Sequence, residues 1–125
     1  MNLVRFSLNV KGTPQMASRV PPAVYDAVLR RDRGCTRCGA TVVQFHHRRS
    51  RRVKDDHQHC RCNGISLCPA CHAWAHANPT AARESGLIVS SYVGEPSSIP
   101  IKTIRGWVHH DCVGTRQQSP PGGTT

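Results

Sequence analysis

Two Cys-x-x-Cys pairs constrain the fold of this chain more than any other feature of its sequence. The first pair is Cys35 and Cys38, and the second is Cys68 and Cys71. Two such turns can bring four thiolates together around one Zn²⁺ ion, with tetrahedral geometry and a closed coordination sphere. A closed sphere leaves no position for a substrate, so the predicted zinc is structural. The two segments that carry the pairs must therefore meet in the folded protein.

The composition indicates that a metal is needed to hold the fold. The chain has 125 residues, enough for one domain, and only 38% of them are hydrophobic and 5% aromatic. The apolar core is thin for this length, and small domains in that position commonly recruit a metal. A structural zinc contributes on the order of 10 kcal/mol to such a fold.

Three further cysteines lie outside these pairs. Cys60 and Cys62 form a Cys-x-Cys motif that, together with the second pair, is a chemically possible alternative ligand set. We favour the two matched pairs because Cys-x-x-Cys turns are the recurrent zinc geometry. Cys60, Cys62 and Cys112 are then expected to be ordinary thiols.

The cysteine count also bears on the cellular compartment. Seven is an odd number, and residues 1–20 lack a charged segment followed by an apolar one, which is the pattern of a secretory signal. No apolar run approaches the length of a membrane span. The sequence predicts a cytoplasmic protein that has reduced thiols and no association with a membrane.

The charge of the chain favours nucleic acid as its partner. The net charge is +10, and fourteen arginines carry it against three lysines. The planar guanidinium group matches phosphate oxygens two at a time. Arg48, Arg49, Arg51 and Arg52 lie in a polar segment, residues 48–62, that reads as an exposed loop. We therefore predict that these four arginines bind the phosphates of a nucleic acid.

The periodicity of the chain predicts an α+β fold in a single domain. Pro22 suits the first turn of a helix of about ten residues that ends near Gly34. The further predicted elements are a strand at 41–45, helices at 69–76 and 79–85, and strands at 87–92 and 99–104 that can pair with each other. The expected boundaries are a flexible arm at 1–20, the domain at 21–112 and a disordered tail at 113–125.

Four histidines have a spacing that suits a second metal site. His72 and His76 are four residues apart, so a helix places them on one face. His46 and His47 end a strand, where successive side chains point to opposite faces, so only one of them can readily join the same ion. Three imidazoles would leave positions open for water and a phosphate oxygen, as catalysis requires. The remaining histidines are expected to be ordinary surface or core residues: His57, His59, His109 and His110.

A resemblance to a family rests on these same residues. His46 and His47, Asn63 and the run at 67–76 together resemble the HNH endonucleases, whose ββα-metal motif, also called the His-Me finger, has a His on its first strand, an Asn in the following loop and His on its helix. The four-cysteine zinc is similar to that of a subgroup of this family. The resemblance covers about residues 20–92. The segments at 78–82, 86–90 and 106–108 look like the small free-standing HNH proteins of bacteriophages, whereas the Cys60-Arg61-Cys62 run departs from the usual pattern.

The resemblance implies roles for individual residues. By similarity to the His-His subset of the family, such as the colicin nucleases, His46, His72 and His76 hold a catalytic divalent cation, with Mg²⁺ or Mn²⁺ expected. His47 is then the general base, and Asn63 holds that base in line by hydrogen bonding across the loop. The implied partner is DNA, expected to be double-stranded. A phage origin would place the protein in the host cell cytoplasm, beside a packaging terminase or in homing.

Two other functions fit parts of the sequence. A non-catalytic, zinc-stapled nucleic-acid-binding module explains the charge and the cysteines, but it gives the four histidines and Asn63 no role. A thiol-disulfide enzyme would need a metal-free active-site thiol and a thioredoxin-like βαβ pattern, and neither is visible in the sequence.

Overall fold

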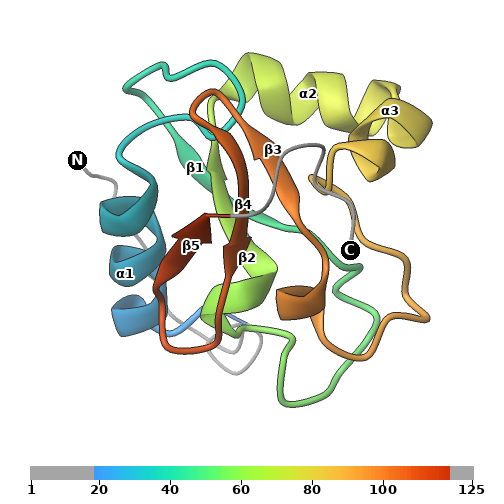
Figure 1. Cartoon of the computed structure of the whole chain (residues 1–125). Coiled ribbons are helices and arrows are strands. Elements are labelled where there is room, and N and C mark those ends of the chain that lie inside the picture. The colour runs from blue at the N-terminus through green and yellow to red at the C-terminus, as the bar shows by residue number, and fades with distance from the viewer. Residues whose placement is uncertain (1–18, 119–125) are drawn as a thin grey trace.

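The computed structural model describes residues 19–118 of the chain (Figure 1). The predicted arm, apart from its last two residues, and the end of the predicted tail lie outside the described residues. No helix within residues 19–118 is long and apolar enough to cross a membrane. The elements are, in chain order, α1 (Pro22–Asp32), β1 (Gln44–His47), η3 (Arg61–Asn63), β2 (Gly64–Leu67), α2 (Pro69–Ala77), α3 (Pro79–Glu84), η4 (Pro96–Ser98), β3 (Ile101–Thr103), β4 (Gly106–His110) and β5 (Arg116–Gln118).

Two small antiparallel sheets form the centre of the structure, which confirms the predicted α+β class in outline. In one sheet β1 pairs with β2, and His46 lies opposite Ile65. The other sheet has the strand order β3-β4-β5. Helix α1 packs against the β1-β2 pair, and α2 and α3 lie side by side at one end of the molecule (Figure 1).

Strand β2 is the most buried element of the fold. All four of its residues are buried, and Ile65 and Leu67 are 0% exposed. Leu87, Ile101 and Val108 join them from the neighbouring segments. Aliphatic side chains and cysteines make up most of this core, as the low aromatic content predicts.

The second Cys-x-x-Cys turn is also the start of α2. The Sγ atom of Cys68 accepts a hydrogen bond from the backbone N–H of Cys71 at 3.4 Å, so Cys68 is the N-cap of the helix. Pro69 occupies the first helical position, where its missing N–H has no cost. Helices α1, α2 and α3 all lie where the sequence predicts them.

Three predictions about the strands need correction. The first strand is Gln44–His47 rather than 41–45, and residues 87–92 form only a single bridge between Arg49 and Val89. Strand β3 pairs with β4 instead, because Gly106, at φ +107°, allows a tight turn between them and local pairing needs no long loop closure. The predicted disordered tail is wrong for Arg116–Gln118, which pair with β4 through the backbone.

Arg48 is buried and holds several loops together, which contradicts the prediction that it is exposed. Its side chain is 1% exposed. Its Nε donates to the carbonyl oxygen of Gly86 at 2.9 Å, and Nη1 donates to Cys62 and Pro96, each at 3.0 Å. Its Nη2 donates to Ile99 at 2.9 Å. A guanidinium group whose donors are satisfied in this way can remain inside a protein.

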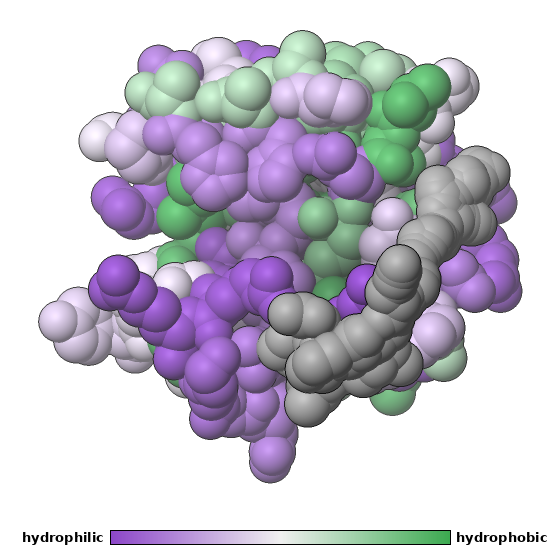
Figure 2. Space-filling model, turned by 180° about the vertical axis from the view of Figure 1, so that it is seen from behind, coloured by the Kyte–Doolittle hydropathy of each residue, from purple (hydrophilic) through white to green (hydrophobic). Residues whose placement is uncertain are grey.

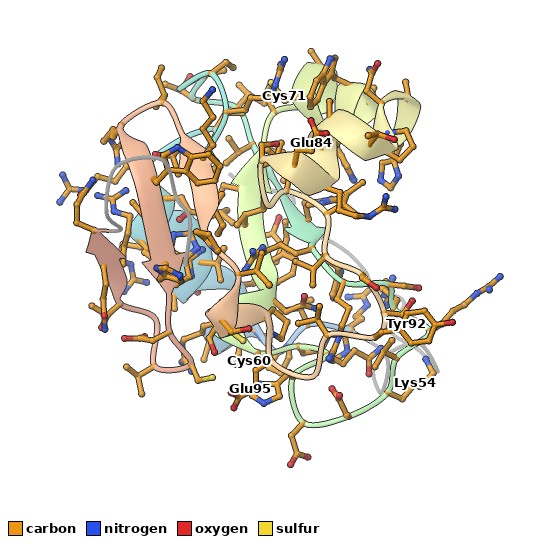
Figure 3. All side chains as sticks on the ribbon, turned by 45° about the vertical axis from the view of Figure 1, so that its right-hand side comes forward. Lys54, Cys60, Cys71, Glu84, Tyr92 and Glu95 are labelled. Carbon is orange, nitrogen blue, oxygen red and sulfur yellow. The ribbon has the colours of Figure 1, made fainter. Side chains whose placement is uncertain are left out.

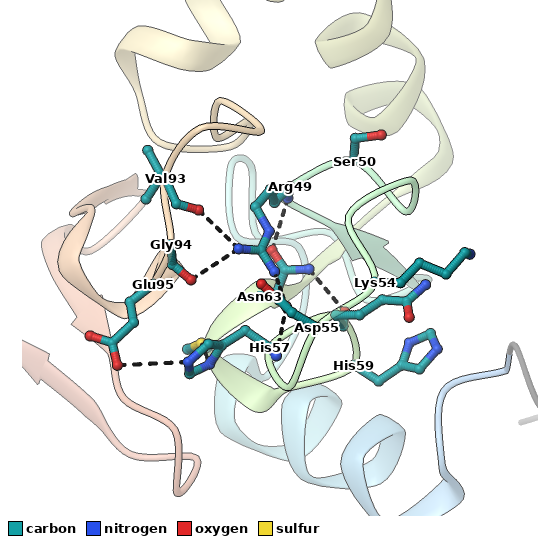
Figure 4. A network of polar contacts seen from close by, with 12 residues as sticks. Arg49, Ser50, Lys54, Asp55, His57, His59, Asn63, Val93, Gly94 and Glu95 are labelled. Carbon is teal, nitrogen blue, oxygen red and sulfur yellow. Dashed lines mark hydrogen bonds and ion pairs between the residues drawn. The ribbon is translucent and has the colours of Figure 1, made fainter.

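Arg49 is buried in the same manner and is likewise wrong as an exposed residue. It is 1% exposed, and its Nη1 donates to the carbonyl oxygens of Val93 at 2.9 Å and Gly94 at 3.0 Å. Its Nη2 forms an ion pair with Asp55 (Figure 4). The two arginines therefore connect the loop after β1 to the segment between α3 and β3.

Replacing Arg48 with Met should destabilise the protein strongly, because carbonyl groups in the interior would lose a charged donor. We expect the free energy of unfolding to fall by about 3 kcal/mol or more. Denaturant unfolding of the variant measures the loss. The matched control is Arg52→Met at an exposed position, which should change stability by less than about 0.5 kcal/mol. Equal effects of the two substitutions would contradict the structural role of Arg48.

Candidate metal centres

The four cysteines of the two Cys-x-x-Cys pairs form a cluster that can hold a metal such as zinc. The Sγ atoms of Cys35, Cys38, Cys68 and Cys71 all lie within 4.8 Å of one another, and those of Cys38 and Cys68 are 3.7 Å apart. Four sulfur donors suit Zn²⁺, which binds thiolates tetrahedrally. The sequence prediction of a four-cysteine site is confirmed to this extent.

The surroundings of this cluster act differently on its thiols. Burial of the Cys35 thiol pushes its pKa upward, but hydrogen bonds from the backbone of Cys68, Cys38 and Arg37 outweigh it and lower the pKa to about 7. The Nη1 atom of Arg37 lies 3.5 Å from Cys71 Sγ. Burial nevertheless raises the pKa of Cys71 to about 12. The lowered pKa of Cys35 favours its thiolate, which is the form of cysteine that binds a metal.

Three imidazoles gather in a separate cluster. The rings of His46 and His72 are 4.9 Å apart between centroids, those of His72 and His76 are 4.9 Å apart, and those of His46 and His76 are 5.7 Å apart. One nitrogen from each ring lies within 4.8 Å of the others. None of the four thiols belongs to this group, so the structure separates the nitrogen and sulfur donors as the sequence suggests.

Hydrogen bonds on the far side of two rings orient them toward the shared centre. The Nε2 atom of His46 lies 2.9 Å from the carbonyl oxygen of Leu87, and Nδ1 of His72 is hydrogen-bonded to Oε1 of Gln44. Each acceptor oxygen holds the proton of that nitrogen and leaves the other nitrogen with its lone pair. Metal-binding histidines almost always carry such outer partners, so the donor set fits a divalent cation.

His46 and His47 are neutral at physiological pH. The pKa of His46 is lowered to about 4, mainly by burial and also by the charges of His72, His76 and Arg48. Burial likewise lowers the pKa of His47 to about 4, with contributions from Arg51 and His59. A neutral imidazole is the form that binds a metal ion or accepts a proton.

An open cleft of about 930 Å³ runs past the imidazole cluster. Figure 2 shows the hollow between the layer of α2 and α3 and the loops below it, with hydrophilic surface along the rim. Arg51 and Arg83 add positive charge to its walls. Arg83, on α3, is a candidate that the sequence analysis missed, because an isolated arginine on a short helix carries no signal. The cleft is lined by Phe45, His46, His47, Arg48, Arg49, Ser50, Arg51, His72, His76, Arg83, Ile88, Val89, Ser90, Ser91 and Tyr92.

His47 lies on the opposite face of β1 from His46 but on the wall of the same cleft. Its Nε2 atom is 3.1 Å from Nδ1 of His59, so the two rings share one proton. His59 was expected to be an ordinary surface or core residue, and no pattern in the sequence indicated this contact. Only the folding of the loop brings the two histidines together.

Asn63 ties the two ends of the loop that follows β1. Its Oδ1 accepts a hydrogen bond from the backbone N–H of Arg49 at 2.8 Å, and its Nδ2 donates to the carbonyl oxygen of Gln58 at 2.9 Å (Figure 4). The side chain is 1% exposed. Asn63 therefore holds the loop against the end of β1. Because Gln58 directly precedes His59, the same hydrogen bond also helps to fix the position of His59.

Only two of the four arginines that were predicted to lie in an exposed basic loop are exposed. Arg51 and Arg52 are exposed, and Arg51 lines the cleft. Arg48 and Arg49 lie inside the protein with their guanidinium groups bound to backbone carbonyls or to Asp55, so they offer little to an external phosphate.

A third cluster brings together one histidine and the three cysteines that were expected to be ordinary thiols. His57, Cys60, Cys62 and Cys112 each place one ligand atom within 4.8 Å of the others. The His-x-x-Cys-x-Cys spacing at 57–62 was a signal for it, but the fourth member lies far away in the sequence and gave none.

Comparison of the chain with protein-family models, with curated proteins and with solved structures finds no match in any of the three.

Removing one thiol should release zinc, whereas removing one imidazole should not. We expect Cys68→Ala to lose one equivalent of tightly bound zinc and to unfold at a lower temperature, because Cys68 is both a candidate ligand and the N-cap of α2. The variant His72→Ala should keep the tightly bound zinc of the wild type. Elemental analysis after dialysis, together with thermal unfolding, measures both effects. An equal loss of zinc in both variants would show that thiolates and imidazoles share an ion.

Proposed function

We propose that this protein is a metal-dependent DNA endonuclease of the HNH type, which hydrolyses phosphodiester bonds. The observation that carries the proposal is the convergence of His46, His72 and His76 on one point in the wall of an open cleft, with His47 beside them and arginines along the walls. A structural role for these imidazoles is hard to reconcile with a position at the surface of a cleft.

The order of the elements supports the same assignment. The antiparallel strands β1 and β2 lead directly into α2, with the first histidines on β1 and the last two on the helix. The ββα-metal motif of the HNH family requires an arrangement of this kind. The sequence order and the spatial positions of the histidines therefore both favour the proposal.

His46, His72 and His76 would hold the divalent cation. When bound, the cation supplies charge neutralisation at the scissile phosphate. An all-imidazole donor set favours a transition-metal ion such as Mn²⁺ over Mg²⁺, which prefers oxygen ligands. The hydrogen bonds to Leu87 and Gln44 keep two of the rings in the orientation that this role needs.

His47 would act as the general base. If the proton shared with His59 lies on Nε2 of His47, its Nδ1 atom has a lone pair that can accept a proton from water. Because the pKa of His47 is lowered to about 4, the ring is not already protonated at neutral pH. Asn63 acts as a positioning residue, since it fixes the loop that presents His59 to the base.

The arginines of the cleft would bind the DNA backbone. Arg51 and Arg83 lie on its walls, Arg52 is exposed next to them, and the chain carries a net charge of +10. Contacts of this kind hold the duplex without reading its sequence. Activity beside a phage terminase in the host cytoplasm stays a prediction from the resemblance alone.

Supercoiled plasmid DNA should be converted to relaxed or linear product in the presence of Mn²⁺ or Mg²⁺. We expect His47→Ala to lower the rate by a factor of ~100 or more, because a general base contributes about that much. Agarose gel analysis of time courses measures the rate. The matched control is His109→Ala, a histidine on β4 that does not line the cleft, which should cut like the wild type.

Two outcomes would count against this proposal. Unchanged cutting by His47→Ala, in protein with normal zinc content, would mean that another group is the base. Tight DNA binding without cutting under any divalent cation would favour the non-catalytic binding module.

The exposed arginines should make DNA binding depend on salt. In a His47→Ala background, which keeps the DNA intact, replacing Arg51 or Arg52 with Gln should remove one phosphate partner. The slope of log K against log salt should then become shallower by about 0.9 for each substitution. Fluorescence anisotropy with a labelled duplex measures the slope. Lys102→Gln, at an exposed position on β3 outside the cleft, is the control and should leave the slope unchanged.

A further inference from the structure

We propose that His57, Cys60, Cys62 and Cys112 bind a second structural Zn²⁺ ion, which fastens the loop after β1 to the turn after β4. The four ligand atoms lie within 4.8 Å of one another. Three sulfurs and one imidazole nitrogen are a donor set that zinc occupies in closed, four-coordinate structural sites. This inference does not depend on the proposed nuclease activity.

Two distances within the cluster match the edges of a zinc tetrahedron. The Sγ atoms of Cys62 and Cys112 lie 3.7 Å and 3.8 Å from the same nitrogen, Nδ1 of His57. With zinc–ligand distances of about 2.0–2.3 Å, the corners of a tetrahedron are about 3.3–3.8 Å apart. The Sγ atoms of Cys38 and Cys68 in the four-cysteine cluster have the same spacing, 3.7 Å. The ligand atoms in the two clusters therefore have similar spacings.

Glu95 supplies the outer partner of the histidine. Its Oε2 atom lies 3.7 Å from Nε2 of His57 (Figure 4), whereas the sulfurs of Cys62 and Cys112 lie near Nδ1 of the same ring. A carboxylate at this position favours the tautomer in which Nε2 carries the proton and Nδ1 faces the metal. The nitrogen that points toward the thiols is thus the one available as a ligand.

The proposed ion would fasten a loop that has little apolar material of its own. Between Ser50 and His59 the only aliphatic side chain is Val53, and most of these residues are exposed. Such a segment cannot bury enough surface to offset the entropy lost on ordering it. A metal ion bound at the end of this loop would supply the stabilising free energy that its side chains do not provide.

The turn that carries Cys112 packs tightly against the Cys60–Cys62 segment. A Cβ atom added at Gly114, at φ +94°, would come within 2.8 Å of Cδ of Arg61. The two segments are far apart in the sequence, and their approach brings the third sulfur to the other ligands. Figure 3 shows Cys60 and Glu95 together at one end of the molecule, with Cys71 of the other cluster at the opposite end.

The proposal also accounts for the cysteine count. Every one of the seven cysteines falls into one of the two sulfur clusters. Seven cysteines cannot all pair in disulfides. A four-cysteine site and a site of three cysteines and one histidine together use all seven.

Zinc stoichiometry and ligand type test the proposal directly. We use His72→Ala as the background, so that the imidazole cluster does not add a third ion. Native mass spectrometry of this variant should show two zinc ions and fully reduced cysteines. X-ray absorption at the zinc edge should show seven sulfur ligands and one nitrogen ligand over the two ions. One zinc with only sulfur ligands, or a disulfide in this cluster, would overturn the proposal.

Substitutions then locate the second ion. Cys112→Ser in the same background should reduce the stoichiometry to one and leave an all-sulfur site. If this variant fails to fold, Glu95→Gln provides the test, since it keeps all four ligands. We expect it to weaken the binding of one of the two zinc ions 10- to 100-fold in a chelator competition. Glu84→Gln, an exposed glutamate on α3 remote from the cluster, should leave both affinities unchanged, and equal affinities in the two variants would contradict the role of Glu95.

Discussion

The four-thiol cluster is the constraint on which the rest of the structure depends. Cys68 contributes to it and at the same time accepts the hydrogen bond that starts α2. A nine-residue helix is unstable by itself, so its position depends on what its first turn is attached to. His72 follows directly after Cys71, the last cysteine of the cluster. The geometry of the sulfur site therefore determines where the imidazoles lie, although the two sets of ligands remain separate.

Buried arginines supply the second part of the framework. Arg48 and Arg49 bind carbonyl oxygens in the segments between β2 and β3, and Arg31 donates to the carbonyl oxygens of Arg61 at 2.9 Å and Gly64 at 2.8 Å. Guanidinium groups thus hold these loop segments together, as a larger apolar core would do in a sequence with more hydrophobic residues. The net charge of the chain consequently overstates the number of cations that its surface presents to a partner.

Features that depend on neighbouring residues could be predicted, and those that depend on distant ones could not. The three helices followed from proline and glycine positions. The two Cys-x-x-Cys pairs and the pair of His72 and His76 followed from short spacings, because each signal lies within one turn or one helix. The burial of Arg48 depends on four carbonyl groups from three separate segments. The pairing of β4 with β5 and the approach of Cys112 to Cys60 depend equally on tertiary contacts. A local pattern such as an arginine run says nothing about which of its members the fold will enclose.

The two hydrogen bonds of the Asn63 side chain divide the loop after β1 into two parts that differ in how well they tolerate insertions and deletions. The exposed tip around Lys54 lies between the two points that the amide holds, Arg49 and Gln58, so added residues there would leave both hydrogen bonds in place. The stretch from Gln58 to Asn63 has no such slack, because a single inserted residue would carry His59 away from His47. Insertions and deletions among relatives of this protein should therefore accumulate at the tip and be absent from the five peptide bonds that precede the asparagine.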